Sequence, residues 1–193
     1  LWILAKLFGR KRKPSTPIVL LDMFLLKDSF NHDKYFTDRY FPNLITLAPA
    51  EEQESIWYFP SLHGIKHPLQ WINMFRNIAR SPQNILMKEQ WLALIDYCSA
   101  LKQAIALPSS VTKFPLWHNC DVSGIILEEL KLDCGSPALV QALLMLRSFK
   151  RFKKGGVQIR GVIDWFENQV GDRAVNLGVR SWYPGVQVKG YLG

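Results

Sequence analysis

The order of apolar and polar positions predicts two strands near the start of the chain. Residues 18–26, IVLLDMFLL, form an apolar run with a single acid, Asp22. Such a run is typical of a strand that is buried on both faces in a parallel sheet. Residues 55–61, SIWYFPS, predict a second, shorter strand, which we expect Pro60 to end.

Between residues 67 and 154 the apolar positions recur at helical spacing instead. A helix is expected from Pro68 until the RSP sequence at residues 80–82 ends it. Residues 87–107 predict one amphipathic helix. Its apolar stripe consists of Trp91, Leu94, Ile95, Cys98, Leu101, Ala104 and Ile105.

Two more helices are predicted after a loop over residues 108–115. The first should begin near Asp121 or Ser123, because both residue types cap helices. The second should begin at Ser136, with proline at its first position, and end at a pair of glycines, residues 155–156.

The last 37 residues predict a strand–helix–strand unit. Residues 157–166 and 186–191 have strand patterns, and residues 169–182 between them have a helical pattern. Because the connection contains a helix, the two strands should be parallel. We therefore expect an α/β fold, a parallel Rossmann-like sheet with a helical insertion over about residues 67–154.

Composition is compatible with one globular domain and places the positive charge in two clusters. The chain has 193 residues, 48% of them hydrophobic, and a net charge of +8. Residues 10–13 carry four positive charges and residues 147–154 carry five, which leaves 15 basic residues against 16 acidic ones. Clusters of this kind bind anionic membranes or nucleic acid, or are the solvated ends of helices.

The basic sequence of residues 1–16 is separated from the rest by a proline-containing break, so we expect a membrane-proximal leader followed by an α/β domain over residues 17–193. The abrupt ends suggest that this domain is truncated at its C-terminus. No apolar run reaches the ~18 residues that a membrane span needs.

Cysteine and histidine spacing predicts neither disulfides nor a metal site. The three cysteines form no CxxC pair, which fits a reducing compartment. His63 and His67 have a spacing that suits zinc only on a helix, and Gly64 and Pro68 argue against a helix there. We expect no metal and no bound cofactor.

Polar residues follow the strand of residues 157–166 where ligands bind in parallel sheets, outside the carboxyl ends of the strands. Glu167 is a candidate general base, and the helix start offers N–H groups to an anion that Arg173 could bind. The alternative is that Asn168 caps the helix while Asp172 and Arg173 pair on its surface. The candidate ligand-binding residues are Asn168, Gln169, Asp172 and Arg173.

A second polar group follows the strand of residues 18–26 and should face the same cleft. His32 is a candidate general base within it. Its candidate substrate-binding residues are Lys27, Asp28 and Asn31. Trp117, in a predicted loop, is a candidate for stacking against a sugar.

Residues 165–191, WFENQVGDRAVNLGVRSWYPGVQVKGY, resemble a segment of bacterial surface-polysaccharide and lipopolysaccharide biosynthesis transferases of the two-domain GT-B type. Residues 81–97, SPQNILMKEQWLALIDY, resemble a helix start of the same group. The Glu-Asn-Gln sequence at residues 167–169 matches, and so does Tyr191, whereas Leu192 replaces an expected polar residue.

This resemblance implies the N-terminal, acceptor-side domain of a glycosyltransferase. Glu167 would be catalytic and Tyr191 would contact substrate. The partners would be a nucleotide sugar, bound mainly by a missing C-terminal domain, and a carbohydrate or lipid-linked acceptor. The expected location is the cytoplasm, peripherally at the inner face of the membrane.

Two other classes remain as alternatives. One is a non-catalytic scaffold on an anionic membrane surface, which would use the basic leader. The other is a nucleic-acid-binding module, which the charge alone suggests. We do not expect a nucleic-acid partner, because the aromatic residues are not interleaved with Lys and Arg and no known motif is present.

Overall fold

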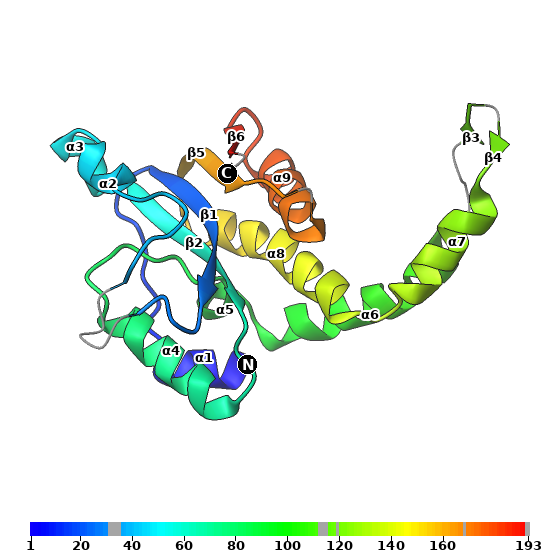
Figure 1. Cartoon of the computed structure of the whole chain (residues 1–193), viewed down its shortest axis with the longest axis horizontal. Helices are drawn as coiled ribbons and strands as arrows, with labels where there is room; N and C mark the ends of the chain where they lie inside the picture. The colour runs from blue at the N-terminus through cyan, green and yellow to red at the C-terminus, as the bar shows by residue number, and fades with distance from the viewer. Residues whose placement is uncertain (31–35, 112–115, 119, 168, 192–193) are drawn as a thin grey trace.

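The computed structural model describes residues 1–30, 36–111, 116–118, 120–167 and 169–191. Its centre is a parallel four-stranded sheet in the order β2-β1-β5-β6 (Figure 1). The strands are β1 (Ile18–Leu26), β2 (Ile56–His63), β5 (Ile159–Trp165) and β6 (Gln187–Tyr191). This confirms the predicted α/β, Rossmann-like fold and the parallel pairing of β5 with β6.

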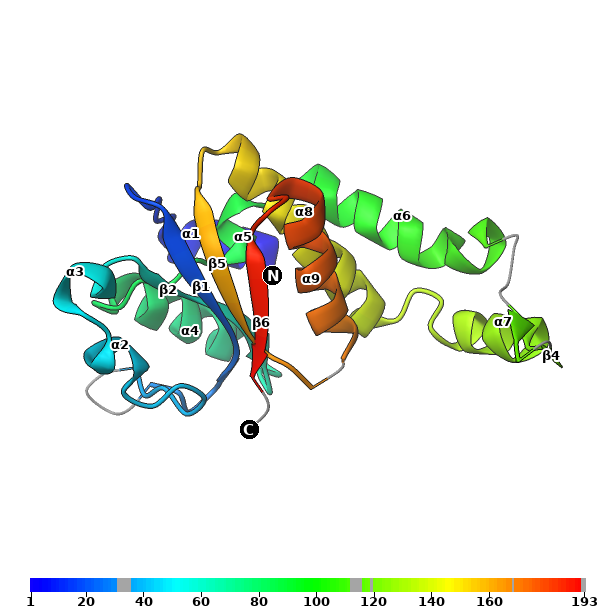
Figure 2. The same cartoon turned by 90° about the horizontal axis from the view of Figure 1, so that it is seen from above.

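One face of the sheet packs against α8 (Pro137–Lys154) and α9 (Val170–Trp182), as Figure 2 shows. Both helices begin and end within one or two residues of their predicted limits. Ser136 caps α8, since its side chain accepts a hydrogen bond from the Leu139 N–H. The buried side chains on this face include Leu20, Phe59, Phe149, Phe152, Val162 and Val175.

The other face packs against α1 (Trp2–Phe8), α4 (Pro68–Arg80) and the connection between β1 and β2, which contains α2 (Leu44–Leu47) and α3 (Ala50–Gln53). Alternation along β1 produces this division, because successive side chains point to opposite faces of a sheet. Its buried side chains include Leu21, Met23, Leu25, Tyr58 and Phe75.

Pro60 does not end β2, contrary to the sequence prediction. The strand continues to His63, and Pro60 is opposite Met23 in the parallel register. β2 is an edge strand of the four-stranded sheet, where a proline without an N–H is tolerated on the outer side. The Tyr58 N–H, two residues earlier and therefore on the same side, points outward to the Asn84 carbonyl.

The prediction of a single amphipathic helix over residues 87–107 was wrong in two respects. The structure has a short α5 (Lys88–Trp91), two extended residues, and a separate α6 (Leu94–Ser110). Asp96 restarts the helix, because its carboxylate accepts a hydrogen bond from the Ala93 N–H at 2.8 Å. The predicted stripe is largely exposed, with only Trp91 and Ala104 buried, and the α6 side chain that is buried in one cluster with Leu144 of α8 is Ala100, outside the stripe.

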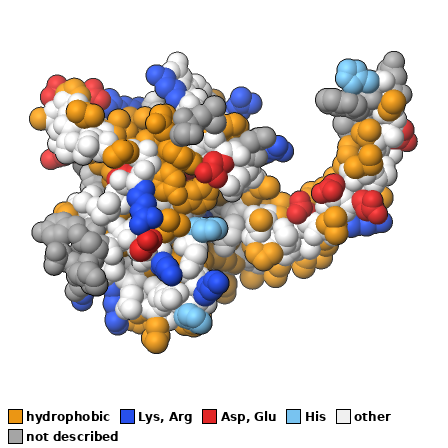
Figure 3. All heavy atoms as spheres, viewed as in Figure 1, with side chains coloured by type: hydrophobic (Ala, Val, Ile, Leu, Met, Phe, Trp, Pro, Cys, Tyr) orange, Lys and Arg blue, Asp and Glu red, His pale blue; other side chains and the backbone are white. Residues whose placement is uncertain are grey.

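α6 continues through Pro108, so the helix extends into the loop predicted over residues 108–115. With α7 (Ser123–Leu132), β3 (Leu116–Trp117) and β4 (Cys120–Asp121), it forms an arm that projects from the body (Figure 1). Hydrophobic side chains are exposed along this arm (Figure 3). The predicted start of α7 is correct, and the Asp121 carboxylate accepts a hydrogen bond from the Ser123 N–H at 2.8 Å.

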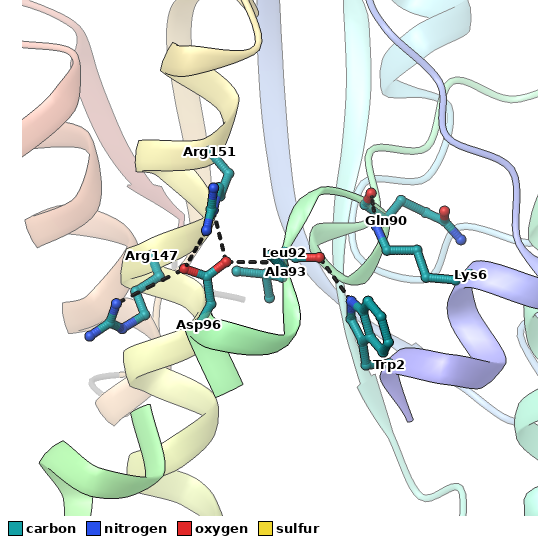
Figure 4. A network of polar contacts seen from close by, with 8 residues as sticks. All are labelled: Trp2, Lys6, Gln90, Leu92, Ala93, Asp96, Arg147 and Arg151. Atoms are coloured by element: carbon teal, nitrogen blue, oxygen red, sulfur yellow. Dashed lines mark hydrogen bonds and ion pairs between the residues drawn. The ribbon is translucent and has the colours of Figure 1, made fainter. Parts of the chain in front are cut away.

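The predicted leader contains α1, which packs against α4 and α5. The Trp2 indole N–H donates to the Leu92 carbonyl at 2.9 Å, and the Lys6 ammonium donates to the Gln90 carbonyl (Figure 4). The Arg12 guanidinium donates to three backbone carbonyls, those of residues 79, 81 and 83. Part of the positive charge of the leader is therefore used in contacts within the fold.

Candidate functional site

Three buried carboxyl groups meet between β1, β5 and the start of α9. Asp22 and Asp164 are opposite each other in β1 and β5, and both point to the face that α9 covers. Asp172, in the first turn of α9, is the third, and their exposed fractions are 7%, 0% and 3% in that order. One carboxylate oxygen from each lies within 4.8 Å of the other two. We call these three residues the acid triad.

Hydrogen bonds at the start of α9 hold two members of the triad in place. The Asp172 carboxylate accepts the backbone N–H groups of Glu167 and Gln169, at 2.9 and 2.8 Å. One turn further along, the Asn176 amide donates to the Asp164 carboxylate at 3.1 Å and to the Asp172 carbonyl at 2.9 Å. The strand end and the helix start are thus joined through these side chains.

The triad has more negative charge than its described partners neutralise. Oδ1 of Asp22 and Oδ1 of Asp164 are buried without a hydrogen-bond partner among the described residues. Burial, and after it the neighbouring carboxylate of Asp164, raises the pKa of Asp22 well above its usual range. Burial also raises the pKa of Asp164, and the Asp172 carboxylate adds to the effect. A cation or a proton at this position would relieve the repulsion.

Lys88 is a buried cation close to the triad. It begins α5, its exposed fraction is 3%, and its ammonium lies 3.1 Å from the equally buried Glu89 carboxylate. Its charge lowers the pKa of Asp22, though less than burial and the other carboxylates raise it. Since Lys88 is also paired with Glu89, it offsets only part of the negative charge of the triad.

Two neighbouring cavities lie beside the first turn of α9, and the smaller one adjoins the acid triad. The smaller one, of about 30 Å³, is lined by Asp22 and Asp172 and has room for a single ion or water. The larger one, of about 570 Å³, opens beside it and is called the edge pocket below. Its lining includes Phe24, Ser61, His63, Lys88, Gln169 and Arg173. The two cavities share Phe24, Ser61 and Gln169 among their lining residues.

The edge pocket has the features of an anion site. The first residues of α9, 169–171, line it, and a helix start presents unpaired N–H groups and the positive end of the helix dipole. Lys88 and Arg173 add two cationic side chains, and His63 adds an imidazole at the end of β2. A phosphate or carboxylate group of a ligand is the chemistry that such a lining suits.

The structure brings together three of the predicted site residues from the start of α9. Gln169 and Arg173 line the edge pocket, and Asp172 belongs to the acid triad. The capping alternative was partly wrong, because the N-cap is Gln169 and the Asp172 carboxylate is buried rather than on the surface. Asp172 nevertheless caps the helix, so capping and site formation coincide at this residue.

Glu167 and Tyr191 lie at the same edge of the sheet, outside the edge pocket. The exposed Glu167 carboxylate accepts hydrogen bonds from the Trp165 indole at 2.8 Å and from the Gln169 amide at 2.6 Å. The Tyr191 ring is 48% exposed, and its centroid lies 5.3 Å from that of Trp165 and 5.9 Å from that of Phe41.

The second predicted polar group is only partly described. Lys27 and Asp28 are exposed, and Asp28 forms an ion pair with Arg39 at 2.8 Å. Neither lines the edge pocket. Asn31, His32 and Asn168 lie outside the described residues. Trp117 is in β3 at the far end of the arm, away from the strand ends (Figure 1).

Sequence reasoning did not assign Asp22, Asp164 or Lys88 to the site. A signal was present, because each of the two aspartates interrupts an otherwise apolar strand run. An ionisable residue at such a position is buried, and buried ionisable groups cluster at functional sites. The expectation of no metal rested on histidine spacing and did not consider carboxylates.

No protein-family model matches the chain, and no curated protein or solved structure matches it either. What is established is therefore the α/β fold with its parallel four-stranded sheet. Among the helices of the described residues, none is both long and apolar enough to cross a membrane.

Proposed function

We propose that this chain is the acceptor-side domain of a glycosyltransferase of the two-domain GT-B type, acting in bacterial surface-polysaccharide biosynthesis. The observation that carries the proposal is the edge pocket, a cavity of about 570 Å³ at the carboxyl edge of the parallel sheet. Its position is the one at which open α/β sheets bind ligands. The resemblance of residues 165–191 to such transferases supports the same assignment.

The ligand chemistry follows from the lining of the pocket. Lys88, Arg173 and the start of α9 favour a phosphate group, such as the one that links a sugar to a lipid or a nucleotide. Gln169 and Ser61 can hydrogen-bond sugar hydroxyls. A phosphorylated carbohydrate combines both kinds of group.

Binding of glucose 1-phosphate tests this proposal. Calorimetry should show that the chain binds glucose 1-phosphate and binds glucose at least tenfold more weakly. Arg173→Ala should weaken binding of the phosphate about tenfold, since a hydrogen bond to a charged group contributes about 1.5–3 kcal/mol. Arg180→Ala is the control, because Arg180 is an exposed arginine of the same helix that does not line the edge pocket.

Equal binding of glucose and glucose 1-phosphate would contradict the proposal. So would equal losses in the two arginine variants, because a general decrease in positive charge would then explain the result.

A membrane-surface scaffold is a second candidate, favoured by one observation. The neighbouring helices α1 and α4 expose large apolar side chains, with exposed fractions of 62% for Ile3, 69% for Leu7 and 73% for Leu69. Apolar side chains beside the basic residues 10–13 suit an anionic lipid surface.

Vesicle flotation tests this second candidate. The chain should float with vesicles that contain phosphatidylserine and not with neutral ones. The double variant Ile3→Ser/Leu7→Ser should lose this binding, and Leu132→Ser, which changes an equally exposed leucine on the arm, should keep it.

A further inference from the structure

The acid triad is an unusual group to bury without a counter-charge. Three carboxyl groups within 4.8 Å of one another are each at least 93% removed from solvent. Transfer of an ionised carboxylate into a protein interior is strongly unfavourable unless the charge is paired. Lys88, whose charge acts on Asp22, is also paired with Glu89.

Two carboxylate oxygens of the triad lack hydrogen-bond partners and indicate the position at which a counter-ion would bind. Oδ1 of Asp22 and Oδ1 of Asp164 accept no hydrogen bond from the described residues. A cavity of about 30 Å³, the size of one ion or water, is lined by Asp22 and Asp172. The Asp22 carboxylate thus combines an unpaired buried oxygen with a cavity of that size, and the unpaired oxygen of Asp164 belongs to the carboxylate opposite it, which is the arrangement that a bound cation would complete.

We propose that Asp22, Asp164 and Asp172 bind a divalent cation of the hard, oxygen-preferring class, which comprises Mg²⁺, Mn²⁺ and Ca²⁺. Carboxylate oxygens are the ligands that these ions prefer. The Asp22–Asp164 pair comes from two adjacent strands and Asp172 from a helix, so the ligands are on regular elements that hold their spacing. Hydrogen bonds from the Asn176 amide and from the Glu167 and Gln169 backbone N–H groups hold two of the three carboxylates in place.

The proposed cation lies next to the edge pocket, which shares Phe24, Ser61 and Gln169 with the small cavity. A divalent cation there would attract the phosphate group of a ligand, as it does in many phosphate-binding sites. This role rests on the proposed function, but binding of the cation itself does not.

Thermal unfolding and Mn²⁺ binding test the proposal on the 193-residue chain without any carbohydrate. After treatment with a chelator, addition of saturating Mg²⁺, Mn²⁺ or Ca²⁺ at constant ionic strength should raise the melting temperature by about 5–10 °C for at least one ion. Electron paramagnetic resonance of free Mn²⁺ should show one ion bound per chain.

Variants of the triad identify the site. Asp164→Asn and Asp22→Asn keep the side-chain shape, so each should abolish the cation-dependent rise while melting no lower than the wild type in chelator. Asp28→Asn, which changes an exposed carboxylate at the same edge of the sheet, should keep the full rise.

No rise with any of the three ions, together with no bound Mn²⁺, would overturn the proposal and leave a shared proton as the counter-charge. Equal Mn²⁺ binding by the wild type and by Asp164→Asn would also overturn it. Because these measurements contain no carbohydrate, failure of the cation site and failure of glucose 1-phosphate binding are separate results.

Discussion

Asp22 and Asp164 are opposite each other on adjacent parallel strands, and both carboxyl groups are buried against α9. Two acids in this relationship repel each other unless a proton or a cation lies between them. The pair therefore links the stability of the sheet to the solution conditions. It also places that sensitivity close to the edge pocket.

In cation-free buffer, the free energy of unfolding should fall as the pH rises. Burial and the nearby Asp164 carboxylate raise the pKa of Asp22, so the folded state holds a proton that the unfolded state releases near pH 4. Between that pH and the raised pKa, the folded state binds more protons, and stability decreases by about 1.4 kcal/mol per pH unit for each proton.

Urea unfolding at a series of pH values measures this dependence. Asp22→Asn should reduce the slope, and Asp28→Asn should leave it unchanged. A wild-type stability that rises over the same pH range more than that of Asp22→Asn would contradict the prediction.

Asp96→Asn should decrease the free energy of unfolding by about 1–3 kcal/mol. The Asp96 carboxylate accepts two hydrogen bonds from Arg151, at 2.8 and 3.1 Å, and joins α6 to α8 (Figure 4). The same carboxylate accepts the Ala93 N–H. Asparagine keeps one oxygen that can still accept this hydrogen bond, but it loses the negative charge and the second acceptor that pair with Arg151. Chemical unfolding measures the loss, and Glu128→Gln, an exposed site on α7, is the control with little expected effect.

Lowering the pH should remove the contribution of Asp96 to the free energy of unfolding. Burial alone would raise the pKa of Asp96, but the hydrogen bonds from Arg151 and from the Ala93 N–H lower it overall. A lowered pKa gives a contribution that is present above about pH 4, the unfolded value, and is lost as the pH falls through the folded value. The difference in stability between the wild type and Asp96→Asn should therefore shrink below pH 4.

Gly178→Ala should destabilise the chain by about 1–3 kcal/mol, through overpacking. A Cβ atom at Gly178 would lie 2.4 Å from the Phe149 ring, at the place where α9 approaches α8 closely. Gly171→Ala, in the same helix, is the matched control because no atom lies within 4 Å of its added Cβ. Equal melting temperatures for the two variants would show that α8 moves away without a penalty.

Glu167→Gln should abolish sugar transfer by the complete transferase and leave the fold intact, if Glu167 is the general base of the proposed reaction. Its carboxylate accepts hydrogen bonds from Trp165 and Gln169, and a glutamine can keep part of this geometry while losing the basic oxygen. Turnover and circular dichroism are the two measurements. Retained turnover would show that Glu167 only supports the start of α9.

The sequence determined the four strands of the parallel sheet, the parallel pairing of β5 with β6 and the longer helices. The continuous apolar run of β1 and the strand–helix–strand pattern at the end of the chain depend on local residue types, which is why they were predictable. Capping by Ser136 is local for the same reason. The sequence also predicted a candidate site at the start of α9, because ligands of parallel sheets bind outside the carboxyl ends of the strands.

Only the tertiary structure decided the acid triad, the continuation of β2 through Pro60 and the exposure of the α6 stripe. Asp22 and Asp172 are 150 residues apart in the sequence, and no local pattern brings them within reach of each other. Whether Pro60 ends its strand depends on whether that strand lies at the edge of the sheet. The helical period of α6 showed an apolar face, but whether another element covers that face is a property of the packing. Local chemistry thus specified the elements, and the contacts between distant segments brought the acid triad together.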